Sequence, residues 1–143
     1  MPSFEISLPD LQTSGPILQG FVGPSRELIA TFGSEAVVAP VPMSALVDSG
    51  AAITVITPET AALLRLSSVG AVSLHTPTTV EPVLCRQFHV NVYFSPSFVV
   101  ENILVVEAAL TGQAFQCLIG RDILSRGVFT YDGVHSRFSL TFG

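Results

Sequence analysis

Apolar and polar residues alternate along much of this chain with a period of two, which is typical of half-buried β-strands. The clearest case is residues 88–94, whose even positions are apolar: Phe88, Val90, Val92 and Phe94. The C-terminal segment repeats the pattern at Phe138, Leu140 and Phe142. Further strands are expected at residues 4–8, 17–22, 28–32, 36–38 and 44–47.

Turn-forming residues divide these segments into short pieces. The chain holds 10 Pro and 11 Gly, with Val, Ile, Thr and Phe filling the stretches between them. This combination favours an all-β barrel or sandwich. Residues 128–142 predict a hairpin with Tyr131, Asp132 and Gly133 at its turn.

Two short helices are expected to interrupt the strands. Thr57 is a plausible N-cap with Pro58 at the first helical position, and residues 59–66 are good helix formers. The second helix spans residues 121–126 and would end at Gly127. With no repeat or linker along the sequence, residues 1–143 are interpreted as a single domain.

Composition excludes several classes of protein. Of the 143 residues, 48% are apolar and only 12% are charged, which argues against disorder and against a coiled coil. The net charge is −5, there is no Lys, and the Arg residues are scattered, so no nucleic-acid partner is expected. Apolar runs such as residues 103–106 are too short to span a membrane. Without a signal peptide at its N-terminus, the chain is expected to be cytoplasmic and to bury apolar surface against a partner.

The cysteines and histidines predict neither a metal nor a cofactor. Cys85 and Cys117 fall in different predicted strands without metal-ligand spacing, which favours two buried free thiols. His75, His89 and His135 are isolated from one another and from paired acids, so a zinc site is not expected.

The first segment with candidate chemistry is residues 45–51, where an apolar strand runs into Asp48, Ser49 and Gly50. Burying a carboxylate is costly unless hydrogen bonds compensate it. The Ser49 hydroxyl can donate such a bond, and Gly50 lets its backbone N–H approach closely. Taken alone, the same three residues are also a common strand-to-turn signal.

The second segment is residues 117–124, about seventy residues further on. A second apolar strand ends there at Gly120 and turns into a short helix through Arg121 and Asp122. Asp122 is interpreted as a first-turn acid that complements the helix dipole, and Arg121 as a structural residue.

Together the two segments resemble the retroviral-type aspartic proteases, or retropepsins, and in particular their small bacterial members. That family carries Asp-Ser/Thr-Gly-Ala after an apolar strand, and a later strand that ends in Gly-Arg-Asp or Gly-Arg-Asn. The resemblance extends from about residue 17 to the C-terminus. It implies a closed, mostly antiparallel acid-protease β-barrel with one or two short helices.

The resemblance also implies a mechanism. Asp48 would face Asp48 of a second copy, the pair would share one proton, and a water between them would attack the peptide bond. Ser49, Gly50 and Ala51 would support the active-site loop and meet the substrate backbone. Since the chain has a single Asp-Ser-Gly, activity would require a homodimer, with the strands at 4–8 and 138–142 contributing to its interface.

Two features depart from the viral pattern. The expected flap over the substrate is a hairpin at residues 72–86 whose tip lacks the usual glycines: His75, Thr76, Pro77, Thr78 and Thr79. His75 is interpreted as a solvated loop residue. Ala52 stands where viral enzymes often place an Asp, so Arg121 must pair with a carbonyl or the other subunit, or remain partly solvated.

These observations predict an aspartic endopeptidase for extended peptides with apolar side chains. The alternative is a catalytically silent dimerisation or peptide-binding module, which the Gly-poor flap and Ala52 favour slightly. The intact Asp-Ser-Gly-Ala opposes that alternative, because a binding module has no need of a mutually repelling Asp pair. A third hypothesis is a protease whose only substrate is its own precursor, from which it cuts itself free.

Ala51 yields a first testable prediction. Pepsin-type enzymes often carry a hydroxyl residue at this position, which can hydrogen-bond the dyad and favour its ionisation. With alanine there, the pH–rate profile should peak at a less acidic pH than that of a digestive pepsin. A profile that peaks near about pH 2 would contradict this prediction.

Overall fold

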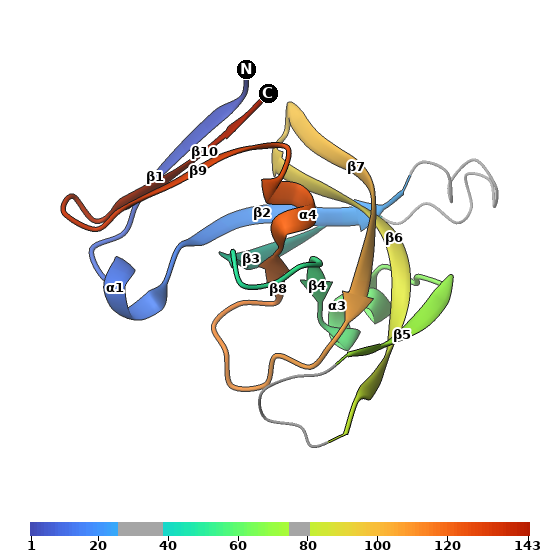
Figure 1. The fold of residues 1–143 in the computed structure, drawn as a ribbon. Helices are drawn as coiled ribbons and strands as arrows, with labels where there is room; N and C mark the ends of the chain where they lie inside the picture. Colours follow the sequence, from blue (N-terminus) through green and yellow to red (C-terminus); the bar gives the residue numbers. More distant parts are fainter. Residues whose placement is uncertain (26–38, 75–80) are drawn as a thin grey trace.

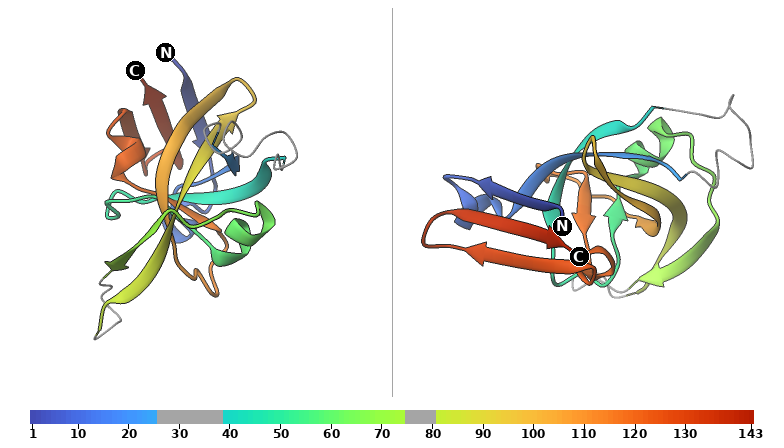
Figure 2. Two further views of the ribbon diagram at one scale, coloured as in Figure 1. Left: turned by 90° about the vertical axis from the view of Figure 1, so that its right-hand side faces the viewer. Right: turned by 90° about the horizontal axis from the view of Figure 1, so that it is seen from above.

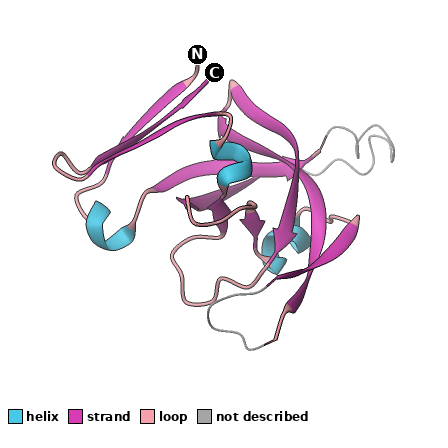
Figure 3. Ribbon diagram, viewed as in Figure 1, coloured by secondary structure: helices cyan, strands magenta, loops and turns pink. Residues whose placement is uncertain are grey.

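A computed structural model describes residues 1–25, 39–74 and 81–143 of the chain. Strands dominate these residues, and three short helices accompany them (Figure 3). The strands expected at 28–32 and 36–38 lie outside the described residues. None of the helices in the described ranges is long and apolar enough to cross a membrane.

Six strands form a closed barrel, as the resemblance to the retropepsins implies. Their hydrogen-bonded order is β2 (Ile17–Pro24), β3 (Val41–Val47), β8 (Cys117–Ile119), β4 (Val55–Ile56), β7 (Phe98–Glu107) and β6 (Val83–Ser95). Pairing of β6 back onto β2 closes the circle. A further strand, β5 (Gly70–Leu74), adds to β6 outside the barrel. The all-β closed fold expected from the sequence is thereby confirmed.

The two ends of the chain form a second, smaller sheet. β1 (Ser3–Ser7) pairs with β10 (Arg137–Phe142), which pairs with β9 (Gly127–Asp132), all antiparallel. We call this the terminal sheet. It brings the two termini side by side at one end of the molecule (Figures 1 and 2).

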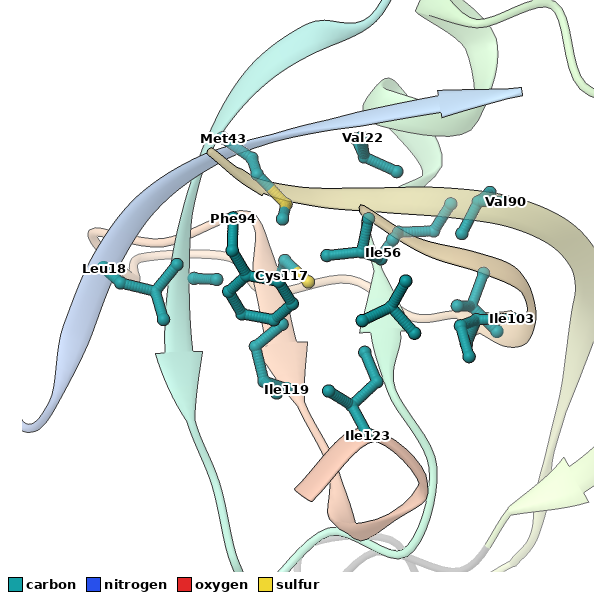
Figure 4. Packing of buried hydrophobic residues seen from close by; sticks show 14 of the residues in the cluster. Leu18, Val22, Met43, Ile56, Val90, Phe94, Ile103, Cys117, Ile119 and Ile123 are labelled. Atoms are coloured by element: carbon teal, nitrogen blue, oxygen red, sulfur yellow. The ribbon is translucent and has the colours of Figure 1, made fainter. Parts of the chain in front are cut away.

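The barrel interior is apolar and well filled. The even positions of β6 from Phe88 to Phe94 are buried, and Phe88 is only 1% exposed, whereas Leu84 near the start of the strand is 73% exposed. On β10 of the terminal sheet, Phe138 is likewise 1% exposed. Leu18, Val90 and Ile119 of the barrel strands and Ile123 of the helix α4 (Arg121–Leu124) belong to one cluster of buried side chains (Figure 4). Their alternation along each strand therefore sets which face of the sheet turns inward.

A cluster of phenylalanines joins the terminal sheet to the barrel. Phe4 of β1 and Phe142 of β10 lie against Phe94 and Phe98 of the barrel strands. Ring centroids are 5.8 Å apart for Phe4 and Phe94 and 5.0 Å apart for Phe98 and Phe142. Aromatic pairs at such distances add to the stabilisation from burial alone.

The two predicted helices are present, with shifted ends. α3 (Pro58–Leu63) begins after Thr57, whose hydroxyl accepts from the Thr60 N–H at 3.3 Å, as the N-cap prediction requires. α4 (Arg121–Leu124) is a single turn, and Gly127 begins β9 instead of ending the helix. α1 (Leu11–Ser14) was not predicted, because four residues are too few to show a helical period.

The C-terminal hairpin is confirmed, but its turn lies later than predicted. Tyr131 and Asp132 still pair with β10, so the turn falls between Asp132 and Arg137. The Asp132 carboxylate closes the turn by accepting from the His135 N–H at 3.1 Å and from Arg137 Nε at 3.2 Å. These contacts between residues on both sides of the turn decide its position.

Both cysteines are buried and free, as predicted. Burial raises the pKa of Cys117 to about 12. Burial, with a smaller contribution from Glu107, also raises the pKa of Cys85. Both thiols therefore stay protonated near neutral pH and act as apolar packing groups.

The Asp132 contacts predict a pH dependence of stability. Hydrogen bonds, chiefly from the His135 side chain, lower the pKa of Asp132 in the folded chain. The resulting stabilisation is complete above the pKa of the unfolded chain and is lost as the pH falls through the lowered pKa. In urea titrations, Asp132→Asn should therefore be less stable than wild type at neutral pH. The difference should shrink toward about pH 3, and a gap of constant size would contradict the assignment.

Candidate active site

Asp48 follows β3 directly, and hydrogen bonds fix its position. Ala45 and Val47 of that strand are buried, which anchors the end of β3 in the core. The Asp48 N–H donates to the Ile119 carbonyl at 2.9 Å, and the Asp48 carboxylate accepts from the Gly50 N–H at 2.9 Å. The side chain of Asp48 is half-buried, so in a single chain its carboxylate remains in contact with solvent.

The rest of the loop is held through its backbone. The Ser49 side chain is exposed, while its carbonyl accepts from Arg121 Nη1 at 2.7 Å. The Ala51 carbonyl accepts from the Arg121 N–H at 2.8 Å. Arg121, whose partner the sequence left open, thus pairs with a carbonyl of the loop that carries Asp48. The roles of Ser49, Gly50 and Ala51 toward substrate stay predictions.

The topology places the two sequence segments side by side. β8 lies between β3, to which it runs parallel, and β4, to which it runs antiparallel. Val47 is opposite Ile119, so the residues after each strand, Asp48 and Gly120, leave the sheet together. A Cβ at Gly120 would lie 2.6 Å from the Ile53 carbonyl carbon, which explains why this position needs glycine.

One residue that the sequence analysis missed joins both segments. Thr54 is fully buried; its Oγ1 donates to Asp122 Oδ1 at 2.7 Å and accepts from the Gly120 N–H at 3.1 Å. Its N–H donates to Asp122 Oδ2 at 3.0 Å. We call Thr54, Gly120 and Asp122 the Thr54 cluster. The signal for it was a hydroxyl residue within the apolar stretch 53–56.

The Thr54 cluster changes the interpretation of Asp122. The sequence suggested only a first-turn acid, and its carboxylate does accept from the Ile123 N–H at 2.8 Å within α4. However, its bonds to Thr54 also connect α4 to the loop after Asp48. Because bonds to a charged acceptor are stronger than neutral ones, Asp122 is a main structural connection of this region.

The chain segments on either side of the expected flap tip form two paired strands. β5 and β6 pair from Gly70 with Gln87 to Leu74 with Val83. At the base, Arg86 contacts Glu107 of β7 through two hydrogen bonds, of 2.7 and 3.3 Å. The expected tip, His75, Thr76, Pro77, Thr78 and Thr79, lies outside the described residues. The structure thus brings both motifs together and pairs β5 with β6, while the flap itself stays a prediction.

Comparison with known proteins identifies the fold. No protein-family model matches the sequence, and no curated protein matches it. Among solved structures, a retropepsin-like aspartic protease from Rickettsia conorii is similar with a TM-score of 0.54 and 14% identity, over 99% of this chain and 91% of that one. The retroviral protease-like domain of Ddi1 from Leishmania major has a TM-score of 0.46 at 17% identity, over 90% of this chain and 94% of that one. The first likeness confirms a retropepsin-like fold.

The Thr54 cluster predicts a large effect from one buried hydroxyl. Thr54→Val keeps the shape of the side chain but leaves the Gly120 N–H without its acceptor and removes one of the three hydrogen bonds to the Asp122 carboxylate. An unsatisfied buried group costs about 1–3 kcal/mol, so the free energy of unfolding in urea should fall by about that amount. Thr54→Ser keeps the hydroxyl and should lose less. Equal losses in the two variants would contradict a role for the hydrogen bonds.

Proposed function

We propose that this chain is one half of a homodimeric aspartic endopeptidase whose two Asp48 carboxylates activate a water molecule. The main support for this proposal is the position and partial exposure of Asp48. It is a half-exposed carboxylate at the end of a buried strand, held by the Gly50 N–H, in a loop bonded to β8 and α4. Catalysis by a carboxylate needs this combination of a fixed position and access to substrate.

The chemistry follows from bringing two such carboxylates together. At close range two like charges repel, so the pair shares one proton and titrates as a unit. The ionised member accepts a proton from the water, and the protonated member polarises the carbonyl of the peptide bond. The tetrahedral diol that forms then collapses with proton transfer to the leaving amine. Ser49 would bond across the dimer and hold the two loops in place.

A homodimer is required because each chain carries one Asp-Ser-Gly. The terminal sheet is the expected interface, and its strands limit how two copies can meet. β10 is bonded on both edges, by β1 and β9, so edge-to-edge pairing would involve β1 or β9. Exposed Val128 and Tyr131 on β9 supply apolar surface for such a contact.

The hairpin formed by β5 and β6 is an argument for a peptide as the substrate. β5 and β6 precede and follow the expected flap tip in the sequence, and the ion pair of Arg86 with Glu107 connects β6 to β7. A hairpin that covers an extended peptide can bond its backbone whatever the side chains are. The apolar residues of the barrel strands favour apolar side chains on either side of the cleaved bond.

Cleavage of a mixed peptide library tests the proposal, with pepstatin as an inhibitor probe. Asp48→Asn should reduce cleavage by at least about 100-fold, the lower range for loss of general acid–base catalysis. Asp10→Asn is the matched control, since Asp10 is exposed and its carboxylate does not cap α1. It should cleave like wild type.

Three outcomes are informative. Equal cleavage by wild type and Asp48→Asn would end the aspartic-protease proposal. A strictly monomeric mass in solution would exclude the two-chain site. A dimer that binds peptides but does not cleave them would favour the silent binding module.

A further inference from the structure

A cavity of about 490 Å³ lies between the terminal sheet and the barrel. It is bordered by Phe4, Glu5 and Ile6 of β1 and by Leu18 and Gln19 of β2, two strands that diverge from α1 (Figure 1). Successive side chains of a strand point to opposite faces. A space that touches consecutive residues of both strands therefore runs along their edges, not over one face.

The edge of β1 toward this cavity is unpaired within the described residues. The Phe142 N–H donates to the Pro2 carbonyl, and the Leu8 N–H donates to the Ser136 carbonyl, both at 2.9 Å. Backbone groups in an antiparallel pair alternate in direction. The even residues of β1 therefore bond to β10, and the odd residues have their N–H and carbonyl groups on the other edge. Of these odd residues, Ser3 and Glu5 border the cavity.

The facing edge of β2 pairs with no strand over its first half, where the Ile17 N–H donates to the Gly15 carbonyl at 2.9 Å. The Val47 N–H donates to the Pro16 carbonyl at 2.9 Å, so the even residues of β2 bond to β3. On the other edge, pairing with β6 begins only at Phe21. Among the described residues, Gln19 thus offers both backbone groups to the same cavity. Two incomplete strand edges face one another across it.

We propose that an extended segment of another protein inserts here as a strand between β1 and β2. The occupant must bond on both of its edges. A strand already in a sheet cannot do so, which excludes β9 of a second copy, since β10 covers one of its edges. An isolated extended peptide satisfies both rows of backbone groups, which is the known geometry of recognition by strand addition.

The lining defines the chemistry of that peptide. Leu18 and Phe94 are apolar and close the inner side of the cavity, so the occupant carries apolar side chains at every second position. Glu5 is the one charged residue among the described lining residues. Its side chain is 61% exposed and its carboxylate lies 3.7 Å from Arg137, so it can still accept from a basic side chain. The intervening positions of the peptide are therefore basic or hydroxylated.

Binding of a synthetic peptide, Val-Arg-Val-Thr-Val-Arg-Val, tests this proposal by fluorescence anisotropy. The protein is the full chain carrying Asp48→Asn, so that the peptide is not cut and the result does not depend on the proposed protease activity. Two further peptides carry N-methyl groups on the odd or the even residues. Because an inserted strand donates from both edges, each set should weaken binding at least about tenfold.

Variants at Glu5 locate the site on the protein. Glu5→Pro removes one N–H from the free edge and leaves the bonds of β1 to β10 intact, so binding should fall about tenfold. Glu5→Thr keeps the N–H, and the loss of an exposed charge should weaken binding only a few-fold. Thermal unfolding of both variants checks that the terminal sheet is retained.

Several outcomes would overturn the proposal. They are no binding of the unmethylated peptide, weakening by only one methylated set, and equal binding by wild-type Glu5 and a folded Glu5→Pro. Weakening by one set alone would indicate addition to a single edge. A dimer that Glu5→Pro dissociates in the absence of peptide would assign the edge to a second copy.

Discussion

The hydroxyl of Thr54 is the contact on which the organisation of the candidate site depends. It accepts a hydrogen bond from the Gly120 N–H and donates one to the Asp122 carboxylate. These two bonds connect the loop after Asp48 with the end of β8 and the start of α4. Gly120 lies 66 positions and Asp122 lies 68 positions after Thr54 in the sequence. Because β8 runs parallel to β3 and beside it, both motifs leave the sheet at the same edge.

This connection explains how the chain holds a carboxylate near its surface in one position. The Asp48 loop is bonded through its backbone to Ile119 and Arg121, so its geometry does not depend on the Asp48 side chain. That side chain makes its bond to Gly50 and remains half-exposed. A loop that is rigid while its carboxylate stays accessible is suited to chemistry, whereas a purely structural Asp is normally satisfied on all sides.

A single chain exposes groups that would be paired or covered in a complex. It has one carboxylate of a proposed pair, exposed apolar residues on β9, and two facing strand edges beside the phenylalanine cluster. The low charge and high apolar content of the sequence fit this picture, because surface that is later covered need not be polar. The terminal sheet thus takes part in two proposed contacts, one with a second copy of the chain and one with an extended peptide.

The sequence by itself determined the features that depend on neighbouring residues. Alternation at 88–94 and 138–142 predicted strands and their inward faces, and Thr57 with Pro58 predicted the start of α3. The motifs around Asp48 and Gly120 predicted the retropepsin-like fold. Only the tertiary structure decided the shifted turn at Asp132, the short helix at Leu11, the role of Thr54 and the carbonyl partner of Arg121. Each of these depends on contacts, many of them distant in sequence, or on a segment too short to show a period, and local patterns do not encode such contacts.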